Sequence, residues 1–237
     1  MDSTDTVKTL IRAEKSALGI DETLDEDFHS FHDAWRGVPR ITLCLDRLNI
    51  LPRLTRVGSV RHEVGHSILH GSLEYYVFNL GSDALTMAER RGVRSSVLKE
   101  ILFLASVAVK DYEVTRLLQN HGYERDQTAL SLHHLKPSRD DLVAWEIAEL
   151  GYDMKLLYLT AQLKPLAVAL PLLKSRRYGE VTRKGVNNFL RHLPPPVRDG
   201  LSILLNTAFP RFRDDTHRNV RFLVNEVLTH SFSTFSQ

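Results

Sequence analysis

The sequence feature that most constrains the fold is the segment RHEVGHSILHG, residues 61–71, which contains His62, Glu63 and His66. Successive residues of an α-helix turn by about 100°, so His62 and His66 lie about 40° apart and one turn apart. Two imidazoles placed in this way can bind one tetrahedral zinc ion. Glu63 points about 100° away from His62, beside such an ion, where a carboxylate can accept a proton from water. The segment therefore requires a helix and predicts a metal centre.

The other side chains of this helix predict that it is buried on more than one side. Val60, Val64 and Ile68 form an apolar stripe, and Leu69 falls on the opposite side, near the histidines. Burying two histidines and a glutamate among apolar residues is costly unless they are paired or bind a metal. The pattern therefore favours a metal site over a polar patch or a chance match.

Local signals predict the limits and the neighbours of the motif helix. We expect it to begin near Ser59, acting as N-cap, and to end at Gly71. Gly65 costs about 1 kcal/mol inside a helix, so we expect a neighbouring backbone to approach closely there. Before the helix, residues 40–50 predict a strand, and residues 28–35 predict an amphipathic helix from aromatic residues spaced three and four apart.

The rest of the chain has a helical period, so the sequence predicts a mainly α (α+β) fold. Its core would hold a small sheet before the motif helix, and the C-terminal half would be helical. We divide the chain into an N-terminal helical segment (1–38), a metal-binding core (39–136) and a helical region packed on that core (137–237). The expected helices span residues 6–18, 94–120, 138–150, 153–163, 166–173, 181–193, 197–205 and 216–230.

Composition narrows the choice of partners and compartment. The 237 residues include 31 basic and 29 acidic side chains, which gives no reason to expect a nucleic-acid partner. Cys44 is the single cysteine, so no intrachain disulfide can form, and we expect a reducing, cytoplasmic location without a signal peptide. The apolar stretch 156–173 is interrupted by Lys164 and Pro165, so we expect two buried helical pieces rather than a transmembrane helix.

The segment His62-Glu63-Val64-Gly65-His66 resembles the zinc-binding motif of the zincin metallopeptidases, including the glycine before the second histidine. The resemblance covers residues 61–71. It implies a mixed fold in which the motif helix packs under a small sheet and the substrate binds as an extra strand. It also implies a bound Zn²⁺ ion held by His62 and His66, a peptide or protein substrate, and Glu63 as the general base that activates water.

The residues after the motif distinguish one zincin variant from the others. The metzincin extension requires glycine and histidine at positions that hold Leu69 and Ser72 here, so it does not fit. His70 comes four residues after His66, on a similar side of the helix. Because the next turn carries it beyond reach of the ion, we expect His70 to support a ligand or to lie on the surface.

The third ligand is expected on the helix 94–120, which offers Asp111 and Glu113. The helical period places Asp111 within the apolar side of that helix and Glu113 beside the polar side, pointing outward. The gluzincin pattern Glu-x-x-Ala-Asp agrees, with Asp111, Val114 and Thr115 at its three positions. Aspartate in place of glutamate is typical of aspzincins. We therefore predict His62, His66 and Asp111 as metal ligands, with Glu113 as the alternative.

Further candidates are weaker. Glu149 and Asp153 are four residues apart but are interrupted by Gly151, so they suit a third ligand less well. A side chain that stabilises the oxyanion of the transition state is usually Tyr, His or Arg. The candidates for this role are Tyr75, Tyr76, Tyr112, His121, His133 and His134. Of these, we expect His133 and His134 to lie on a solvated loop.

The sequence supports three functional hypotheses. The leading one is a zinc metalloendopeptidase. The alternative is a catalytically silent or regulatory metal-binding protein on a zincin fold, whose helical half binds a partner or inhibits the site. A third is a purely structural zinc site, closed by His70 as fourth ligand. In the first case, residues 1–38 would be placed to cover the cleft, as a pro-segment does.

Overall fold

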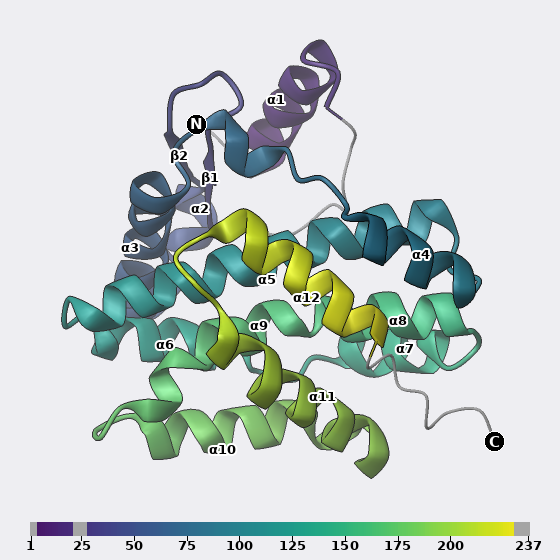
Figure 1. The fold of residues 1–237 in the computed structure, drawn as a ribbon. Helices are drawn as coiled ribbons and strands as arrows, with labels where there is room; N and C mark the ends of the chain where they lie inside the picture. Colours follow the sequence, from purple (N-terminus) through teal and green to yellow (C-terminus); the bar gives the residue numbers. More distant parts are fainter. Residues whose placement is uncertain (1–3, 21–27, 230–237) are drawn as a thin grey trace.

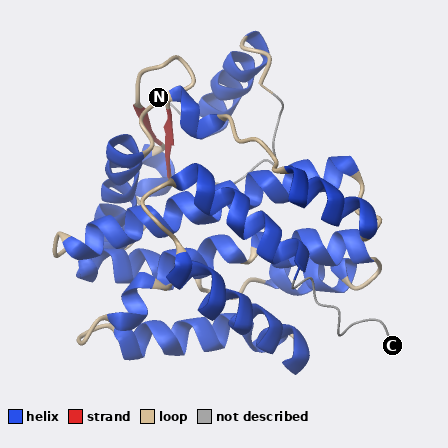
Figure 2. Cartoon of the chain, in the orientation of Figure 1, coloured by secondary structure: helices blue, strands red, loops and turns tan. Residues whose placement is uncertain are grey.

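The computed structural model describes residues 4–20 and 28–229, which form mostly α-helices and one small antiparallel sheet (Figure 2). The predicted mainly α (α+β) fold class is confirmed. The strands are β1 (Ser30–Asp33) and β2 (Arg40–Leu43). The α-helices are α1 (Thr4–Ala17), α2 (Leu45–Leu48), α3 (Arg53–Leu69), α4 (Ser82–Arg90), α5 (Ser95–Asn120), α6 (Glu124–His134), α7 (Arg139–Ala148), α8 (Tyr152–Ala161), α9 (Leu163–Ala169), α10 (Gly179–Phe189), α11 (Pro195–Ala208) and α12 (Thr216–Thr229). Short 3₁₀ turns span Leu73–Tyr76, Pro171–Lys174, Leu190–His192 and Phe209–Arg211.

Helix α5 is the central element of the fold. It runs for 26 residues through the middle of the molecule and is contacted by α3, α8, α9 and α12 (Figure 1). No glycine or proline interrupts it, so its backbone hydrogen bonds continue over the whole length. A helix that is covered on several sides has no single polar face. Its charged residues can therefore point into the protein as well as into solvent.

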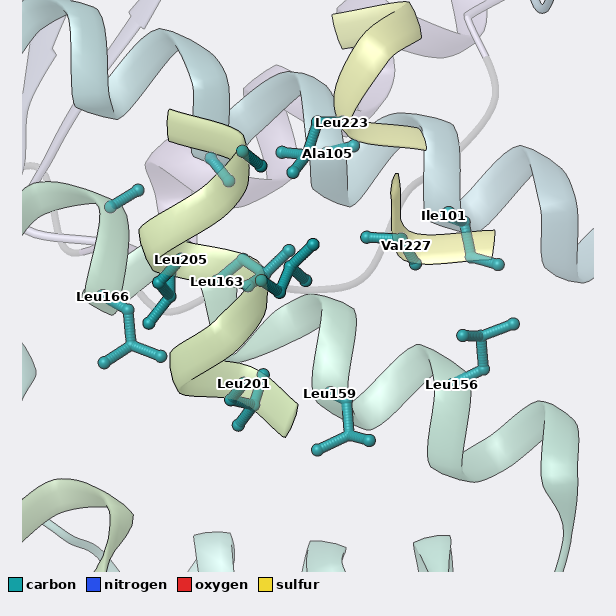
Figure 3. Packing of buried hydrophobic residues seen from close by; sticks show 14 of the residues in the cluster. Ile101, Ala105, Leu156, Leu159, Leu163, Leu166, Leu201, Leu205, Leu223 and Val227 are labelled. Carbon is teal, nitrogen blue, oxygen red and sulfur yellow. The ribbon is translucent and has the colours of Figure 1, made fainter. Parts of the chain in front are cut away.

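The hydrophobic core lies between α5 and the helices of the C-terminal half. Figure 3 shows leucines of α8, α9, α11 and α12 gathered in one buried cluster with Ile101 and Ala105 of α5. Complete burial of one such leucine contributes about 1.5–3 kcal/mol. Helices α8, α9 and α12 of the region 137–237 therefore pack directly on α5, while the division into the three regions itself stays a prediction.

The apolar stretch 156–173 forms α8, α9 and a 3₁₀ turn, so the prediction of two buried helical pieces is confirmed. Pro165 lies in the first turn of α9, where the missing N–H costs no helical hydrogen bond. None of the described helices is both long and apolar enough to span a membrane.

The sheet corrects one prediction and confirms another. Residues 28–35 were expected to be helical, but Ser30–Asp33 form β1, which pairs antiparallel with β2 so that Ser30 faces Leu43 and Asp33 faces Arg40. The strand predicted over residues 40–50 is confirmed at Arg40–Leu43 but is wrong beyond it, since Leu45–Leu48 form α2. Gly37, between the strands, has φ of 77°, a left-handed conformation that permits the tight connection. The N-terminal segment 1–38 is therefore not purely helical.

The motif helix α3 is longer and more exposed than predicted. It begins at Arg53, after Pro52, so Ser59 is an interior residue and not an N-cap. The predicted buried stripe is wrong, since Val64 is 43% and Ile68 is 69% exposed. The polar side of α3 faces the protein interior, where it meets α5 and α6. The apolar stripe of α3 therefore faces outward, and the polar side that carries His62 and His66 faces inward.

Candidate metal centre

The structure brings His62, His66 and Asp111 together between α3 and α5. Asp111 Oδ1 lies 3.0 Å from His66 Nε2 and 3.5 Å from His62 Nε2. The ligand atoms of the three residues all lie within 4.8 Å of one another. A tetrahedral zinc ion with bonds of about 2.0–2.2 Å separates its ligand atoms by about 3.3–3.6 Å. The two distances from the carboxylate oxygen lie near this range, and two imidazole nitrogens with one carboxylate oxygen are ligand types that zinc accepts.

Close packing at Gly65 allows the two helices to present these side chains to one another. A Cβ atom at Gly65 would lie 2.6 Å from Cγ1 of Val114, which is too short for any real contact. The predicted close approach is therefore found, but a side chain of α5 makes it and not a backbone. The β-branched Val114 has little rotamer freedom in a helix and cannot easily move away.

Asp111 and Glu113 are both buried, each 7% exposed. The prediction that Glu113 points outward is wrong, because α12 packs on α5 and its residues Thr216 and Asn219 cover Glu113. Glu113 does not join the histidine pair of the motif. It contacts His70 instead, with 3.0 Å between Oε2 and Nε2. Of the two carboxylates, Asp111 is the one placed at the predicted ligand position.

The electrostatics of the cluster suit a metal site. Burial alone would raise the pKa of Asp111, but hydrogen bonds from His62 and His66 hold it well below its usual range. Burial lowers the pKa of His66 to about 3. At pH 7 Asp111 is therefore charged and His66 is neutral, which are the forms that bind a cation. Burial would lower the pKa of His62, but its hydrogen bond to Asp111 raises the pKa above the ordinary value, so a cation has to displace the proton that this pair holds.

Gln127 of α6 orients His62. The amide nitrogen of Gln127 donates to the carbonyl oxygen of Gly58 at 3.0 Å, so its Oε1 faces His62 Nδ1 at 3.4 Å. In a neutral His62 whose Nδ1–H donates to Gln127, the lone pair of Nε2 is directed toward Asp111, where an ion would bind. Sequence reasoning missed both α6 and Gln127. The uninterrupted residues between Gly122 and Pro137 could have indicated the helix, but no local signal indicates the role of its glutamine.

His70 is 1% exposed, so the surface alternative for this residue is wrong. Its Nδ1 lies 3.2 Å from Nδ1 of His66. Both of its ring nitrogens therefore face protein groups, His66 on one side and Glu113 on the other. Of the two alternatives predicted for His70, the contact with the predicted ligand His66 fits the supporting position.

Glu63 lies beside the predicted ligands and is held by the sheet. Ser30 of β1 donates a hydrogen bond of 3.0 Å to Oε1 of Glu63, and its hydroxyl lies 2.5 Å from that of Ser59. Burial raises the pKa of Glu63 above its ordinary value, while His62 and Ser30 oppose the shift. A carboxylate with a raised pKa is a stronger base once ionised.

His32 of β1 is a site residue that sequence reasoning missed. Its ring stacks on that of His66, with centroids 6.0 Å apart and an interplanar angle of 11°. Tyr76 places its hydroxyl 3.1 Å from Nδ1 of His32, while the buried Nε2 has no hydrogen-bond partner among the described residues. Burial lowers the pKa of His32 to about 4. The alternation of Ser30 and His32 on one face of a strand was the available signal, and the helical interpretation concealed it.

The other predicted oxyanion candidates are distributed around the fold. Tyr75 packs against the ring of His70, with 5.1 Å between centroids. Tyr112 packs on Phe209, at 5.1 Å, and His121 is exposed at the end of α5. Of the six candidates, Tyr76 is the one that reaches a ring stacked on a predicted ligand.

The histidine pair at the end of α6 differs from its prediction. Both residues lie in the last turn of α6, so the predicted loop is wrong, but His134 is exposed as expected and His133 is half-buried. Glu149 is exposed at the end of α7, and Asp153 pairs with Arg94 at 2.6 Å, so neither carboxylate is part of the metal cluster.

Comparison with known proteins gives no additional guide to this centre. No protein-family model, curated protein or solved structure matches the chain. Support for a function therefore comes from the geometry of His62, Glu63, His66 and Asp111.

Proposed function

We propose that the protein is a zinc-dependent metallopeptidase of the zincin type, with His62, His66 and Asp111 as zinc ligands. One observation carries the proposal: the ligand atoms of these residues, from two helices, lie within 4.8 Å of one another. The residue next to the first histidine is Glu63, whose carboxylate is oriented by Ser30. This arrangement contains the ligands and the base that hydrolysis of a peptide bond requires.

Glu63 is the proposed general base. A zinc ion bound by the three ligands would polarise a substrate carbonyl and lower the pKa of water toward neutrality. Glu63 accepts the proton released by water and passes it to the leaving amine. Ser30, which donates to Oε1, fixes the carboxylate so that its second oxygen is available for that proton.

The surroundings of His70 favour a catalytic over a closed structural site. A structural zinc has four protein ligands, and His70 was the suspected fourth. In the described part of the chain, the metal cluster contains three residues, and both ring nitrogens of His70 face His66 and Glu113. Three protein ligands leave one position for water and substrate.

The sheet next to α3 suits an extended peptide. Within the described residues, β1 and β2 pair only with each other, so neither has a second strand on its outer edge, where a peptide could add one. His32 and Tyr76 lie beside His66, where donors can reach the carbonyl oxygen of a bound peptide. We propose a peptide or protein as substrate and a reducing, cytoplasmic location, since the single cysteine, Cys44, is buried and free.

A proteolysis assay tests this function. An unfolded, fluorescently labelled polypeptide is incubated with the purified protein, with and without a chelator, and one equivalent of zinc is then restored. We expect cleavage that the chelator stops and zinc restores. The exposed His121 provides a control, since His121→Ala should keep full activity. Stoichiometric zinc without cleavage would favour the regulatory alternative, and cleavage that resists chelation would contradict the proposed chemistry.

A further inference from the structure

A continuous hydrogen-bonded chain connects the proposed metal ligand His66 with the last helix, α12. His66 Nδ1 lies 3.2 Å from His70 Nδ1, and His70 Nε2 lies 3.0 Å from Glu113 Oε2. Thr216 Oγ1 donates to the same Glu113 oxygen at 2.7 Å, and Asn219 Nδ2 donates to Oε1 at 2.7 Å. His70, Glu113 and Asn219 are buried, His66 and Thr216 are half-buried, and α12 packs on α5 at the end of the chain of contacts (Figure 1).

With zinc bound at Nε2 of His66 in place of the contact to Asp111, the contacts allow one arrangement of protons. A neutral histidine that binds a metal through Nε2 carries its proton on Nδ1. His66 must therefore donate from Nδ1 to Nδ1 of His70, which has to accept. Neutral His70 then carries its own proton on Nε2, and this proton is directed at Glu113.

The contacts of α12 lead independently to the same arrangement of protons, in which Glu113 accepts from His70. Oδ1 of Asn219 accepts from the backbone N–H of Arg213 at 2.9 Å, which fixes the orientation of the amide. Nδ2 of Asn219 therefore faces Glu113 as a donor. Both oxygens of Glu113 consequently accept hydrogen bonds from α12. Oε2 also accepts the hydrogen bond that Nε2–H of His70 donates.

We propose that Glu113 is a positioning residue of the metal centre, which acts through His70 to hold His66 in the tautomer that presents Nε2 to zinc. The proposal rests on the metal centre proposed above and adds a role for α12, because Thr216 and Asn219 hold Glu113. Thr115 occupies the motif position of the supporting carboxylate, but its buried hydroxyl has no hydrogen-bond partner among the described residues. Glu113, which contacts His70, therefore fills the supporting role that Thr115 leaves open.

The decisive variant is Glu113→Gln, which keeps the shape of the side chain. Its amide can accept at one oxygen only, while the site supplies donors to both positions. If the amide nitrogen faces His70, that ring must accept at Nε2 and carry its proton on Nδ1. His66 then loses its acceptor and has to carry a proton on Nε2. Since supporting residues of this kind alter metal affinity by about 10- to 100-fold, we expect the Kd for zinc to rise by that factor.

The control is Glu124→Gln on α6. Glu124 is a partly buried carboxylate that also accepts at both oxygens, from Gln119 at 3.3 Å and Ser175 at 2.8 Å, but it is not part of this chain of contacts. Competition with a chelating dye gives the Kd for zinc of each folded variant. We expect Glu124→Gln to bind zinc as the wild-type protein does. Equal zinc affinity in Glu113→Gln and in the wild type would overturn the proposal.

A second measurement needs no variant. Long-range ¹H–¹⁵N spectra of the zinc-loaded wild-type protein report which ring nitrogen of each histidine carries a proton. We expect the proton of His66 on Nδ1 and that of His70 on Nε2. A proton on Nδ1 of His70 would overturn the proposal even if Glu113→Gln failed to fold. Both readouts are independent of hydrolysis, so a protein that binds zinc but cleaves nothing contradicts the peptidase proposal alone.

Discussion

Replacing Glu63 with glutamine is expected to abolish peptide hydrolysis while zinc remains bound. Glutamine keeps the length of the side chain and can still accept the hydrogen bond from Ser30. It cannot accept a proton from water, and the loss of a general base lowers the rate by about 10²–10⁴-fold. The zinc ligands are unchanged, so the metal content of Glu63→Gln should equal that of the wild-type protein.

The measurement combines kcat with metal analysis on one preparation. Ser30→Ala provides a graded comparison, because it removes only the donor that orients Glu63. We expect its kcat to fall by less than that of Glu63→Gln. Cleavage at the wild-type rate by Glu63→Gln would show that another group activates the water.

Replacing Asp111 with asparagine is expected to weaken zinc binding more than any change outside the three ligands. Asparagine keeps the shape but removes the negative charge that lies 3.0 Å from His66 Nε2 and 3.5 Å from His62 Nε2. Changes to residues that only support a ligand cost about 10- to 100-fold in affinity, so loss of a charged ligand should raise the Kd by more than about 100-fold. Hydrolysis should be lost together with the metal.

The comparison of three carboxylates identifies the ligand. Asp153→Asn, which breaks a surface ion pair with Arg94, should leave the Kd for zinc unchanged. Glu113→Gln should give an intermediate Kd and Asp111→Asn the highest. A larger loss in Glu113→Gln than in Asp111→Asn would reverse the assignment and make Glu113 the third ligand.

Much of the helical fold could be predicted because its signals are local. Helix α5 contains no glycine or proline over 26 residues, and α7 begins at a capping box made by Ser138 and Asp141. The histidine pair of the motif also depends on local geometry, since residues four apart share one face of any helix. His62, His66 and the inward orientation of Asp111 are therefore features that the sequence predicts.

The errors arise where distant segments decide the structure. Residues 28–35 fit a helical period over eight residues, but their pairing with β2 makes them a strand and brings Ser30 and His32 to the site. Glu113 was placed outward because a helical wheel assumes one solvent-facing side, which α12 removes by covering α5. The alternation of Ser30 and His32 was the one local sign of the strand, and the covering of Glu113 by α12 leaves no sign in the sequence around it.

The position of zinc itself tests the proposed metal centre most directly. Diffraction data collected above and below the zinc absorption edge, from crystals of the protein grown with one equivalent of zinc, locate the ion without reference to activity. We expect one anomalous peak per chain, about 2.0–2.2 Å from Nε2 of His62, Nε2 of His66 and a carboxylate oxygen of Asp111. A peak bound by His70 or Glu113, or no peak between α3 and α5, would contradict the proposed centre.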